Sequence, residues 1–254
     1  MINRSSAAPR ATLFWALGLC VGLSACSVMP PQEEARRGSV ATLKQLPLQF
    51  NAHDKSQWEK MVLPGKLRTA YKVERQNPGY ALKAQAESSA SMLRQRLHIA
   101  PDQLGRLSFD WRVAQLIPGA DMMQRESEDS PVRLILVFEG DRQQFSPKNA
   151  MLSELTQSLT GDPLPYATLM YVWCNQCPPE SVIVNPRTDR IRKLAVESGP
   201  GRVGQWLTYQ RNIRADFEKA FGEAPGALLG LAIMTDTDNT RSATRAWYGQ
   251  VRLD

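Results

Sequence analysis

Histidine and cysteine are scarce in this chain of 254 residues, which contains only two histidines and four cysteines. So few histidines limit metal and acid–base chemistry that depends on imidazole. The sequence also lacks a glycine-rich phosphate loop, a Gly-x-Ser-x-Gly nucleophile elbow and a His-Glu-x-x-His zinc helix. It has no block of lysine and arginine, and no stripe of basic and aromatic residues, of the kind that nucleic-acid binding uses. We therefore expect no nucleic-acid partner.

The apolar run near the N-terminus is too short for a transmembrane helix. Residues 11–23 form a run of 13 residues without a charge, whereas a helix needs about 20 apolar residues to cross the hydrocarbon core. Arg4 and Arg10 make the preceding segment positive. A positive start followed by an apolar run of this length is typical of a secretory signal peptide, which we predict at residues 1–25.

The end of this segment resembles the bacterial lipobox, because an aliphatic residue and two small residues precede Cys26. The resemblance implies that Cys26 becomes the acylated first residue of the mature protein and holds it at a bilayer. Each buried CH₂ of such chains contributes about 0.8 kcal/mol. Ser27 follows, where Asp would favour the inner membrane, so we expect the outer membrane with the domain facing the periplasm. A plain secretory signal cleaved near Ala25 is the alternative.

The segment after the signal is polar and contains proline, without an apolar period. We predict a flexible tether at residues 26–42. Removal of the signal lowers the formal net charge from +6 to +4, because two arginines and no acidic residue leave with it. So small a net charge favours solubility and by itself gives no indication of a polyanionic partner.

From residue 43 on, the sequence pattern favours strands. Residues 107–113 alternate between apolar and polar side chains, as in a half-buried strand. Residues 132–138 and 166–173 are almost continuously apolar, as in central strands covered on both faces. Further strands are predicted at 68–75, 80–84, 181–184, 191–196, 227–234 and 246–253, the first two as a hairpin.

Two segments are predicted to be helical. The first follows Ser146, which can cap it, and ends at Gly161, which can adopt a left-handed conformation. The second covers residues 205–221, along an apolar stripe that begins at Trp206. Strands and helices do not alternate as βαβ units. The predicted fold is therefore mainly β, an antiparallel β-sandwich with two inserted α-helices, and residues 43–254 form one domain.

The second half of the chain resembles a family of bacterial envelope proteins described as domain of unknown function 3047. The matching segments are residues 107–113, 127–138, 169–173, 196–199, 206, 211–213, 221–222 and 230–253. The last of these, which contains residues 233–240, is the strongest match. The resemblance covers roughly residues 43–254. It implies a jelly-roll-like sandwich, similar to lectin-like or carbohydrate-binding modules, and no established activity. The chain departs from the family pattern at residues 174–177, where the family tends to have a glycine-type turn.

Cys174 and Cys177 have the Cys-x-x-Cys spacing of redox dithiols. A redox thiolate needs a helix N-terminus after the first cysteine, whereas Pro178, Pro179 and a predicted strand follow here. A structural zinc ion would need about four ligands. We predict a disulfide, which suits an oxidising periplasm. Redox catalysis, metal binding and free thiols remain alternatives.

Asp236, Asp238 and Asn239 place hard oxygen atoms close together before the last strand. Calcium prefers such ligands and needs six to eight of them, so a calcium ion is possible here. The glycine and later glutamate of an EF-hand are absent. The alternative is a turn in which these side chains cap their own backbone.

Two further groups of polar residues are candidates for a site. Glu126 and Glu128 would share a face if their segment were extended, and paired carboxylates catalyse glycoside hydrolysis. The alternative is a solvated loop before a buried strand. Asp110 and Arg112 lie on the polar side of their predicted strand and could bind a ligand there or form an ordinary ion pair.

Tryptophan can stack on sugar rings, but most of the tryptophans fall on apolar faces. The spacing predicts that Trp111, Trp173 and Trp206 lie in the core. Trp247 and Tyr248, near the acidic turn, are the best candidates for an exposed aromatic pair that binds a ligand.

Three functions are compatible with these features. The first hypothesis is a lipid-anchored sandwich that binds a glycan or another envelope component without catalysis. The second is a carbohydrate-active hydrolase or lyase on the same sandwich, which requires two carboxylates facing each other in a cleft. The third is a structural partner of an envelope assembly, which requires a sizeable exposed apolar patch.

Overall fold

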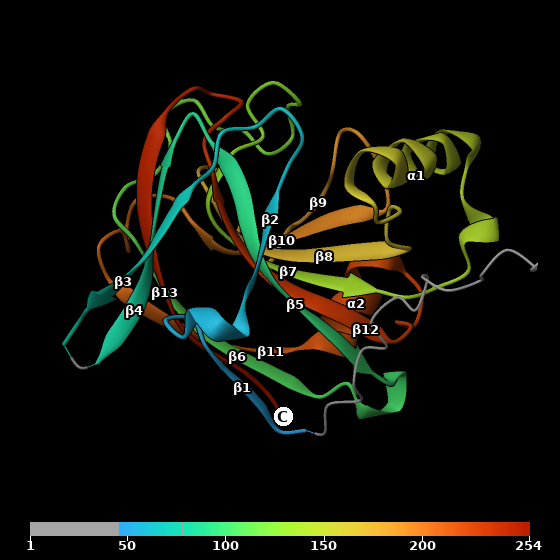
Figure 1. Ribbon diagram of the computed structural model, residues 1–254, viewed down its shortest axis with the longest axis horizontal. Coiled ribbons are helices and arrows are strands. Elements are labelled where there is room, and N and C mark those ends of the chain that lie inside the picture. The colour runs from blue at the N-terminus through green and yellow to red at the C-terminus, as the bar shows by residue number, and fades with distance from the viewer. Residues whose placement is uncertain (1–45, 78) are drawn as a thin grey trace, which may run out of the picture. The chain divides into compact units, whose positions relative to one another are not determined.

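The computed structural model describes residues 46–77 and 79–254. The predicted signal peptide (1–25), the predicted acylation site at Cys26 and the tether (26–42) lie outside the described residues. Thirteen strands of the described part form two sheets that pack face to face (Figure 1). The prediction of a mainly β sandwich with two helices is confirmed.

Sheet A has six strands in the order β11-β6-β13-β4-β3, with β1 also paired to β13. These strands are β1 (Leu48–Asn51), β3 (Ala70–Arg75), β4 (Tyr80–Glu87), β6 (Arg106–Val113), β11 (Trp206–Asn212) and β13 (Ala243–Leu253). Sheet B has seven strands in the order β2-β5-β12-β7-β8-β10-β9. These are β2 (Glu59–Val62), β5 (Ala90–Ile99), β7 (Ser130–Phe138), β8 (Ala167–Cys174), β9 (Val182–Val184), β10 (Ile191–Ser198) and β12 (Leu228–Asp236).

Every predicted strand has its counterpart in these sheets, including the hairpin of β3 and β4. The structure adds β1, β2 and β5, which the sequence analysis missed, and β11, which it assigned to a helix. Among the described strands, β8 and β10 pair in parallel and the other named pairs are antiparallel.

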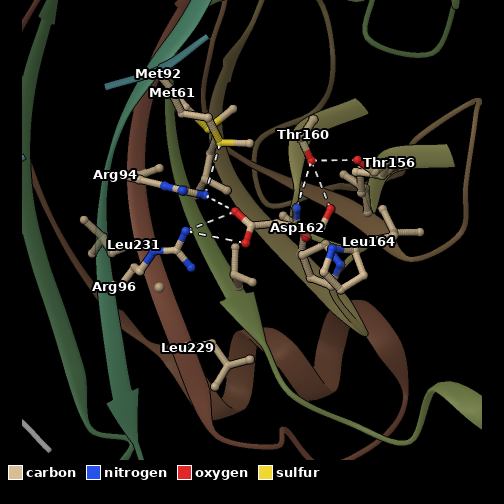
Figure 2. A pocket seen from close by; sticks show the side chains of 18 of the residues that line it. Met61, Met92, Arg94, Arg96, Thr156, Thr160, Asp162, Leu164, Leu229 and Leu231 are labelled. Atoms are coloured by element: carbon tan, nitrogen blue, oxygen red, sulfur yellow. Dashed lines mark hydrogen bonds and ion pairs between the residues drawn. The ribbon is translucent and has the colours of Figure 1, made fainter. Parts of the chain in front are cut away.

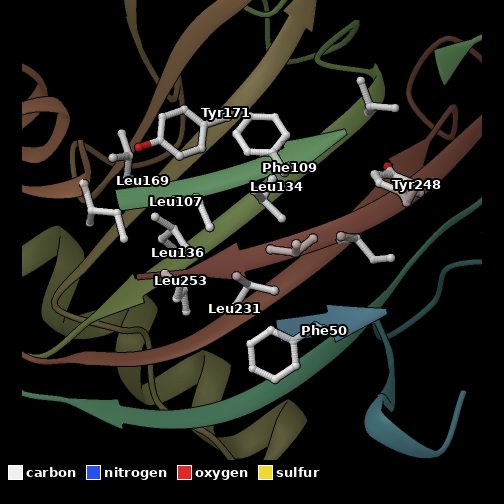
Figure 3. Packing of buried hydrophobic residues seen from close by; sticks show 14 of the residues in the cluster. Phe50, Leu107, Phe109, Leu134, Leu136, Leu169, Tyr171, Leu231, Tyr248 and Leu253 are labelled. Atoms are coloured by element: carbon white, nitrogen blue, oxygen red, sulfur yellow. The ribbon is translucent and has the colours of Figure 1, made fainter. Parts of the chain in front are cut away.

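The main core lies between the inner faces of the two sheets. Figure 3 shows side chains from β6 and β13 packed against those of β7, β8 and β12, with Phe50 of β1 at one side. Phe109 of sheet A stacks on Tyr171 of sheet B at a centroid distance of 5.6 Å. Trp111 and Trp173 are fully buried here, as predicted.

The first helix, α1 (Pro147–Thr160), begins and ends where the sequence predicts. The Ser146 side chain accepts a hydrogen bond from the Asn149 N–H, and Gly161 ends the helix with φ of 82°. Asn149 is its only fully buried side chain. The helix lies beside the outer face of sheet B, and its Asn149 side chain is hydrogen-bonded to Thr188 and Asp189 in the connection between β9 and β10.

The second helix, α2 (Ile213–Phe221), is shorter than the sequence predicts. Residues 206–212 alternate between exposed and inward positions and pair with β6 as strand β11. The helix starts only after Asn212, whose side chain accepts a hydrogen bond from the Ala215 N–H at 3.0 Å. The prediction of one helix over 205–221 is therefore wrong, because pairing at the edge of sheet A prevails over helical periodicity.

Short 3₁₀ helices connect some strands, namely η1 (Lys55–Gln57), η2 (Pro101–Gln103) and η3 (Arg142–Gln144). None of the helices in the described residues combines the length and apolar character that crossing a membrane requires.

Candidate functional site

The outer face of sheet A carries a row of aromatic and cationic side chains. Trp206 lies directly opposite Arg112 on the neighbouring strand, Arg112 lies opposite Trp247, and Trp247 lies opposite Lys83. We call these four residues the tryptophan–arginine ladder. Sequence reasoning missed its outermost member, because Trp206 was predicted in the core; its side chain is 36% exposed.

The Arg112 guanidinium lies between the two indole rings of the ladder. Its central carbon is 5.5 Å from the Trp206 ring centre and 4.0 Å from the Trp247 ring centre. Each cation–π contact of this kind contributes about 0.5–1 kcal/mol at an exposed site. Among the described residues, no carboxylate or carbonyl accepts a hydrogen bond from this guanidinium, and its Nε is buried without a partner.

The other cation of the ladder is neutralised. The Lys83 Nζ lies 2.9 Å from a carboxylate oxygen of Glu74. The Trp247 Nε1–H donates to the same carboxylate at 3.1 Å. The hydrogen bond from Lys83 lowers the pKa of Glu74 below its ordinary value. Arg112 is therefore the uncompensated charge of the ladder.

Asp110 lies two residues from Arg112 on the same face of β6, where β13 bulges. Its carboxylate accepts a hydrogen bond from the Gln250 N–H at 3.1 Å, and burial raises its pKa. A side chain at Gly249 would collide with this carboxylate, so glycine allows the close approach. Asp110 and Arg112 thus flank one patch of sheet A without pairing with each other.

Tyr248 does not belong to this patch. Its side chain is 2% exposed and lies between the sheets, where its hydroxyl is 2.9 Å from Thr235 Oγ1. Successive residues of a strand point to opposite faces, so Trp247 and Tyr248 cannot form one exposed pair. That prediction is wrong, and the aromatic partner of Trp247 on the outer face is Trp206.

A groove of about 350 Å³ lies on the outer face of sheet B (Figure 2). Its floor comes from β5, β7, β8 and β12, and one wall comes from α1 and the segment that follows it. Met61, Met92, Ile135, Val137 and Met170 are among its apolar lining residues. Ligand sites are commonly concave, largely apolar and of 300–1,000 Å³, so this groove is the second candidate site.

Ion pairs form the polar wall of the groove (Figure 2). Asp162, just after α1, lies 2.8 Å from Arg94 and 3.1 Å from Arg96, both on β5. Glu59 of β2 lies 2.9 Å from Arg94 and 3.4 Å from Arg96. Hydrogen bonding to Arg94 is the largest cause of the lowered pKa of Glu59. We call these four residues the groove bridges.

A second cluster of charges on the same face of sheet B is fully buried. Glu128 lies 2.7 Å from the Lys193 Nζ, and both oxygens of Asp236 accept from Arg133 at 2.8 Å. Arg133 also donates to the backbone carbonyl of Glu128 at 2.7 Å. We call these four residues the buried charge cluster. Burial lowers the pKa of Lys193 to about 8 and raises that of Asp236 to about 6, although the opposite charges nearby act against both shifts.

The two glutamates proposed for catalysis do not share a face. Glu128 is buried in the charge cluster, with further hydrogen bonds from Asn185 and Arg187. Glu126 lies in a turn and is exposed. The segment is not extended, so this pair does not provide the two facing carboxylates that the hydrolase hypothesis requires.

The acidic turn gathers three carboxylates, from Asp129, Asp236 and Asp238, whose closest oxygens lie within 4.8 Å of one another. Arg133 donates hydrogen bonds to both carboxylate oxygens of Asp236, and Lys66 forms an ion pair with Asp238. Asn239 contributes its backbone N–H to Asp129 at 3.2 Å, not a side-chain oxygen. Calcium requires six to eight oxygen ligands, and this turn already satisfies its carboxylates with cations and N–H groups, so the donor set does not fit calcium.

Cys174 and Cys177 are joined in a disulfide at the end of β8. Cys174 is buried in a small apolar cluster that also contains Met122 and Ile183. The described chain continues from Cys177 through a turn to β9, so no helix begins directly after the first cysteine, unlike in a redox dithiol. The bond closes a loop of four residues at the end of β8, which is an inner strand of sheet B.

The fold and these sites define a two-sheet β-sandwich with one aromatic–cationic surface and one apolar groove. The sequence matches the family model described as protein of unknown function (DUF3047) over residues 56–252. The chain belongs to this family. No curated protein sequence matches it.

Several solved structures share the general fold at low similarity. The family 11 carbohydrate-binding module of a cellulosomal cellulase of Clostridium thermocellum is 8% identical, with 84% of this chain and 95% of that chain covered and a TM-score of 0.41. Cellulose induced protein Cip1 is 6% identical, with 82% and 96% covered and a TM-score of 0.40. The xylan binding module CBM86 of Roseburia intestinalis is 12% identical, with 83% and 96% covered and a TM-score of 0.30.

Proposed function

We propose that this protein is a lipid-anchored envelope protein that binds an acidic glycan without catalysis, through the tryptophan–arginine ladder of sheet A. The observation that carries the proposal is the Arg112 guanidinium, held between Trp206 and Trp247 with no carboxylate partner among the described residues. A preorganised cation of this kind is available to a ligand at little entropic cost.

The chemistry of the ladder favours a sugar that carries a carboxylate. The apolar C–H face of a pyranose packs on an indole ring, and Trp206 is the exposed ring of the ladder. The planar guanidinium of arginine matches the two oxygens of a carboxylate and can bind them together. Lys83 adds little net charge because Glu74 neutralises it.

The anchor is supported by the sequence pattern that ends at Cys26. An acylated Cys26 would hold the sandwich at the periplasmic face of the outer membrane, on a tether of residues 26–42. Replacement of Cys26 by Ala should abolish metabolic labelling with a radioactive or alkyne fatty acid. Labelling that survived in this variant would contradict the anchor, while leaving the glycan site open to test.

Glycan binding can be measured by titration calorimetry with oligogalacturonate, and with cello-oligosaccharide as the neutral control. We expect Trp206→Ala to weaken binding of the acidic sugar at least tenfold, because it removes the exposed ring. Arg112→Gln should remove the preference for the acidic sugar. Arg245→Gln is the matched control, since Arg245 is exposed on β13 but is not part of the ladder.

Failure of both sugars to bind would contradict glycan binding at this ladder. Equal binding of both sugars by the unaltered protein would contradict the role assigned to Arg112. Circular dichroism of each variant separates loss of binding from loss of the fold.

A further inference from the structure

We propose that the groove on the outer face of sheet B binds an aliphatic carboxylic acid, with its chain along the floor and its carboxylate at Arg142. This site is separate from the ladder on sheet A and goes beyond the glycan proposal. The inference rests on the lining of the groove, on a cation that has no anionic partner among the described residues, and on the helix that forms part of one wall.

The lining favours an aliphatic ligand over a sugar or an aromatic one. Among the described residues that line the groove, none has an aromatic side chain. The floor is formed by methionine, isoleucine, valine and leucine side chains, such as Met92, Ile135 and Met170. Methionine is unbranched and adaptable, and it fills irregular apolar space around flexible ligands. A sugar would find no aromatic ring on which to stack.

The charged side chains at the groove include one cation that has no anionic partner among the described residues. Arg94 and Arg96 are each bridged to both Glu59 and Asp162, so these two cations are balanced by two anions. Arg142, in η3, also lines the groove and is exposed. Among the described residues, none forms an ion pair or hydrogen bond with its side chain. The groove therefore combines an apolar floor with one free guanidinium, which suits a ligand with one carboxylate.

The helix α1 forms part of one wall of the groove. Thr156 and Thr160 face the groove, and Figure 2 shows both on the side of the helix near Asp162. The helix is held near its start, where the Asn149 side chain bonds Asp189 at 2.6 Å and Thr188 at 2.8 Å, and near its end by Asp162.

One exposed stripe of α1 is apolar. Met151, Leu155 and Leu159 recur every four residues, so they share one face of the helix. Their side chains are 64%, 53% and 60% exposed. An exposed apolar stripe on the helix that lines the groove suits a ligand that comes from a lipid phase.

Titration calorimetry of the full-length protein tests this proposal. The ligands are dodecanoate and octanoate below their critical micelle concentrations and dodecanol below its solubility limit. We expect dodecanoate to bind most tightly, dodecanol about tenfold more weakly because it lacks the charge, and octanoate more weakly because it fills less of the floor. Absence of dodecanoate binding to the folded protein would overturn the proposal.

Two variants locate the site, one filling the groove from its wall and the other from its floor. Thr156→Phe fills it from α1, and Met92→Trp fills it from β5; each should weaken dodecanoate binding at least tenfold. Ser158→Phe is the matched control, because Ser158 is exposed on α1 and, like Thr156, only donates to a backbone carbonyl one turn earlier. Unchanged affinity in both filling variants, with the fold intact, would place the ligand elsewhere and overturn the proposal.

Arg142→Gln tests the charge. It should weaken dodecanoate binding about tenfold and leave dodecanol binding unchanged, whereas Lys148→Gln, at an exposed cation on α1, should change neither. An equal loss for the acid and the alcohol would contradict the role of Arg142.

Light scattering tests whether a second copy of the chain occupies the groove instead. If the unaltered protein were a dimer and Thr156→Phe were a monomer, the groove would be a dimer interface and the proposal would be overturned.

Discussion

The outer face of sheet B carries two charge clusters, each of two basic and two acidic side chains, that differ in burial. In the buried charge cluster, Lys193 is 0% and Arg133 is 3% exposed. In the groove bridges, the side chains of Arg96 and Glu59 are about half exposed. Along β7, Arg133 lies in the first cluster, whereas Ile135 and Val137, further along the strand, line the groove.

The difference in burial determines what each cluster can do. A buried ion pair loses the hydration of both partners, so each partner depends on the other and the cluster is fixed. An exposed pair contributes about 0–1 kcal/mol and is screened by salt. The buried charge cluster therefore closes one end of the sheet face permanently. The groove bridges hold α1 over the other end weakly enough to exchange with water or a ligand.

Replacement of Glu128 by Gln should have the largest effect on stability. It removes one partner of the Lys193 pair at 2.7 Å and leaves the buried cation uncompensated. Loss of one partner of a buried pair costs about 3–5 kcal/mol. Urea denaturation of the folded domain measures the free energy of unfolding directly.

Glu126→Gln is the matched control for this comparison. Glu126 lies two residues earlier in the same loop and is exposed, so its neutralisation should change stability by less than about 0.5 kcal/mol. If the two variants were equally stable, Glu128 would not be the counter-ion that the buried cluster requires.

The sequence predicts the two clusters unequally. Arg133 belongs to a run that reads as a central strand, and its pairing with Asp236 joins residues 103 positions apart. Residue spacing does not encode such long-range pairs. Glu128 carries a carboxylate in an acidic segment, so the sequence suggests a solvated loop or a catalytic acid. Only the folded structure shows that the Glu128 carboxylate is buried and paired with Lys193.

The groove was missed because one strand was missed. Residues 90–99 form β5, which supplies Met92, Arg94 and Arg96 to the groove. Its outer face mixes apolar and charged side chains, and its inner face includes Gln95, so the alternation of polar and apolar residues is broken. In contrast, the caps of α1 and the apolar runs of β7 and β8 are local signals, and the sequence predicts these elements correctly.

The buried charge cluster should also make the free energy of unfolding depend on pH. We expect this effect to be the second largest, after that of Glu128→Gln. Burial lowers the pKa of Lys193 to about 8, from an ordinary value of 10.5. Between these values the unfolded chain binds the proton and the folded chain does not. Stability therefore rises with pH, by roughly 2 kcal/mol between pH 8 and 9.5, because each pKa unit corresponds to about 1.4 kcal/mol.

Comparison of the unaltered protein with Lys193→Met isolates the contribution of Lys193 to the pH dependence of stability. Urea denaturation at pH 8.0, 8.5, 9.0 and 9.5 should show a rise in the difference between the two free energies of unfolding. Other lysines and tyrosines titrate equally in both proteins and cancel. A difference that stays constant over this range would mean that Lys193 keeps its proton in the folded state.

Asp162→Asn should have the smallest effect on stability and a larger one on local motion. Asp162 is 37% exposed and bridges Arg94 and Arg96, so its neutralisation should lower the free energy of unfolding by less than about 1 kcal/mol. Because this bridge fastens the end of α1, amide hydrogens of the last turn of the helix should exchange faster with solvent. Glu154→Gln, which removes an exposed charge on the same helix, should leave exchange unchanged. The difference in the free energy of unfolding between the unaltered protein and Asp162→Asn should also shrink in 1 M salt, where the Debye length falls to about 3 Å. A loss above about 2 kcal/mol, insensitive to salt, would place the groove bridges with the buried charge cluster and would remove the contrast between a fixed end and an adjustable end of this sheet face.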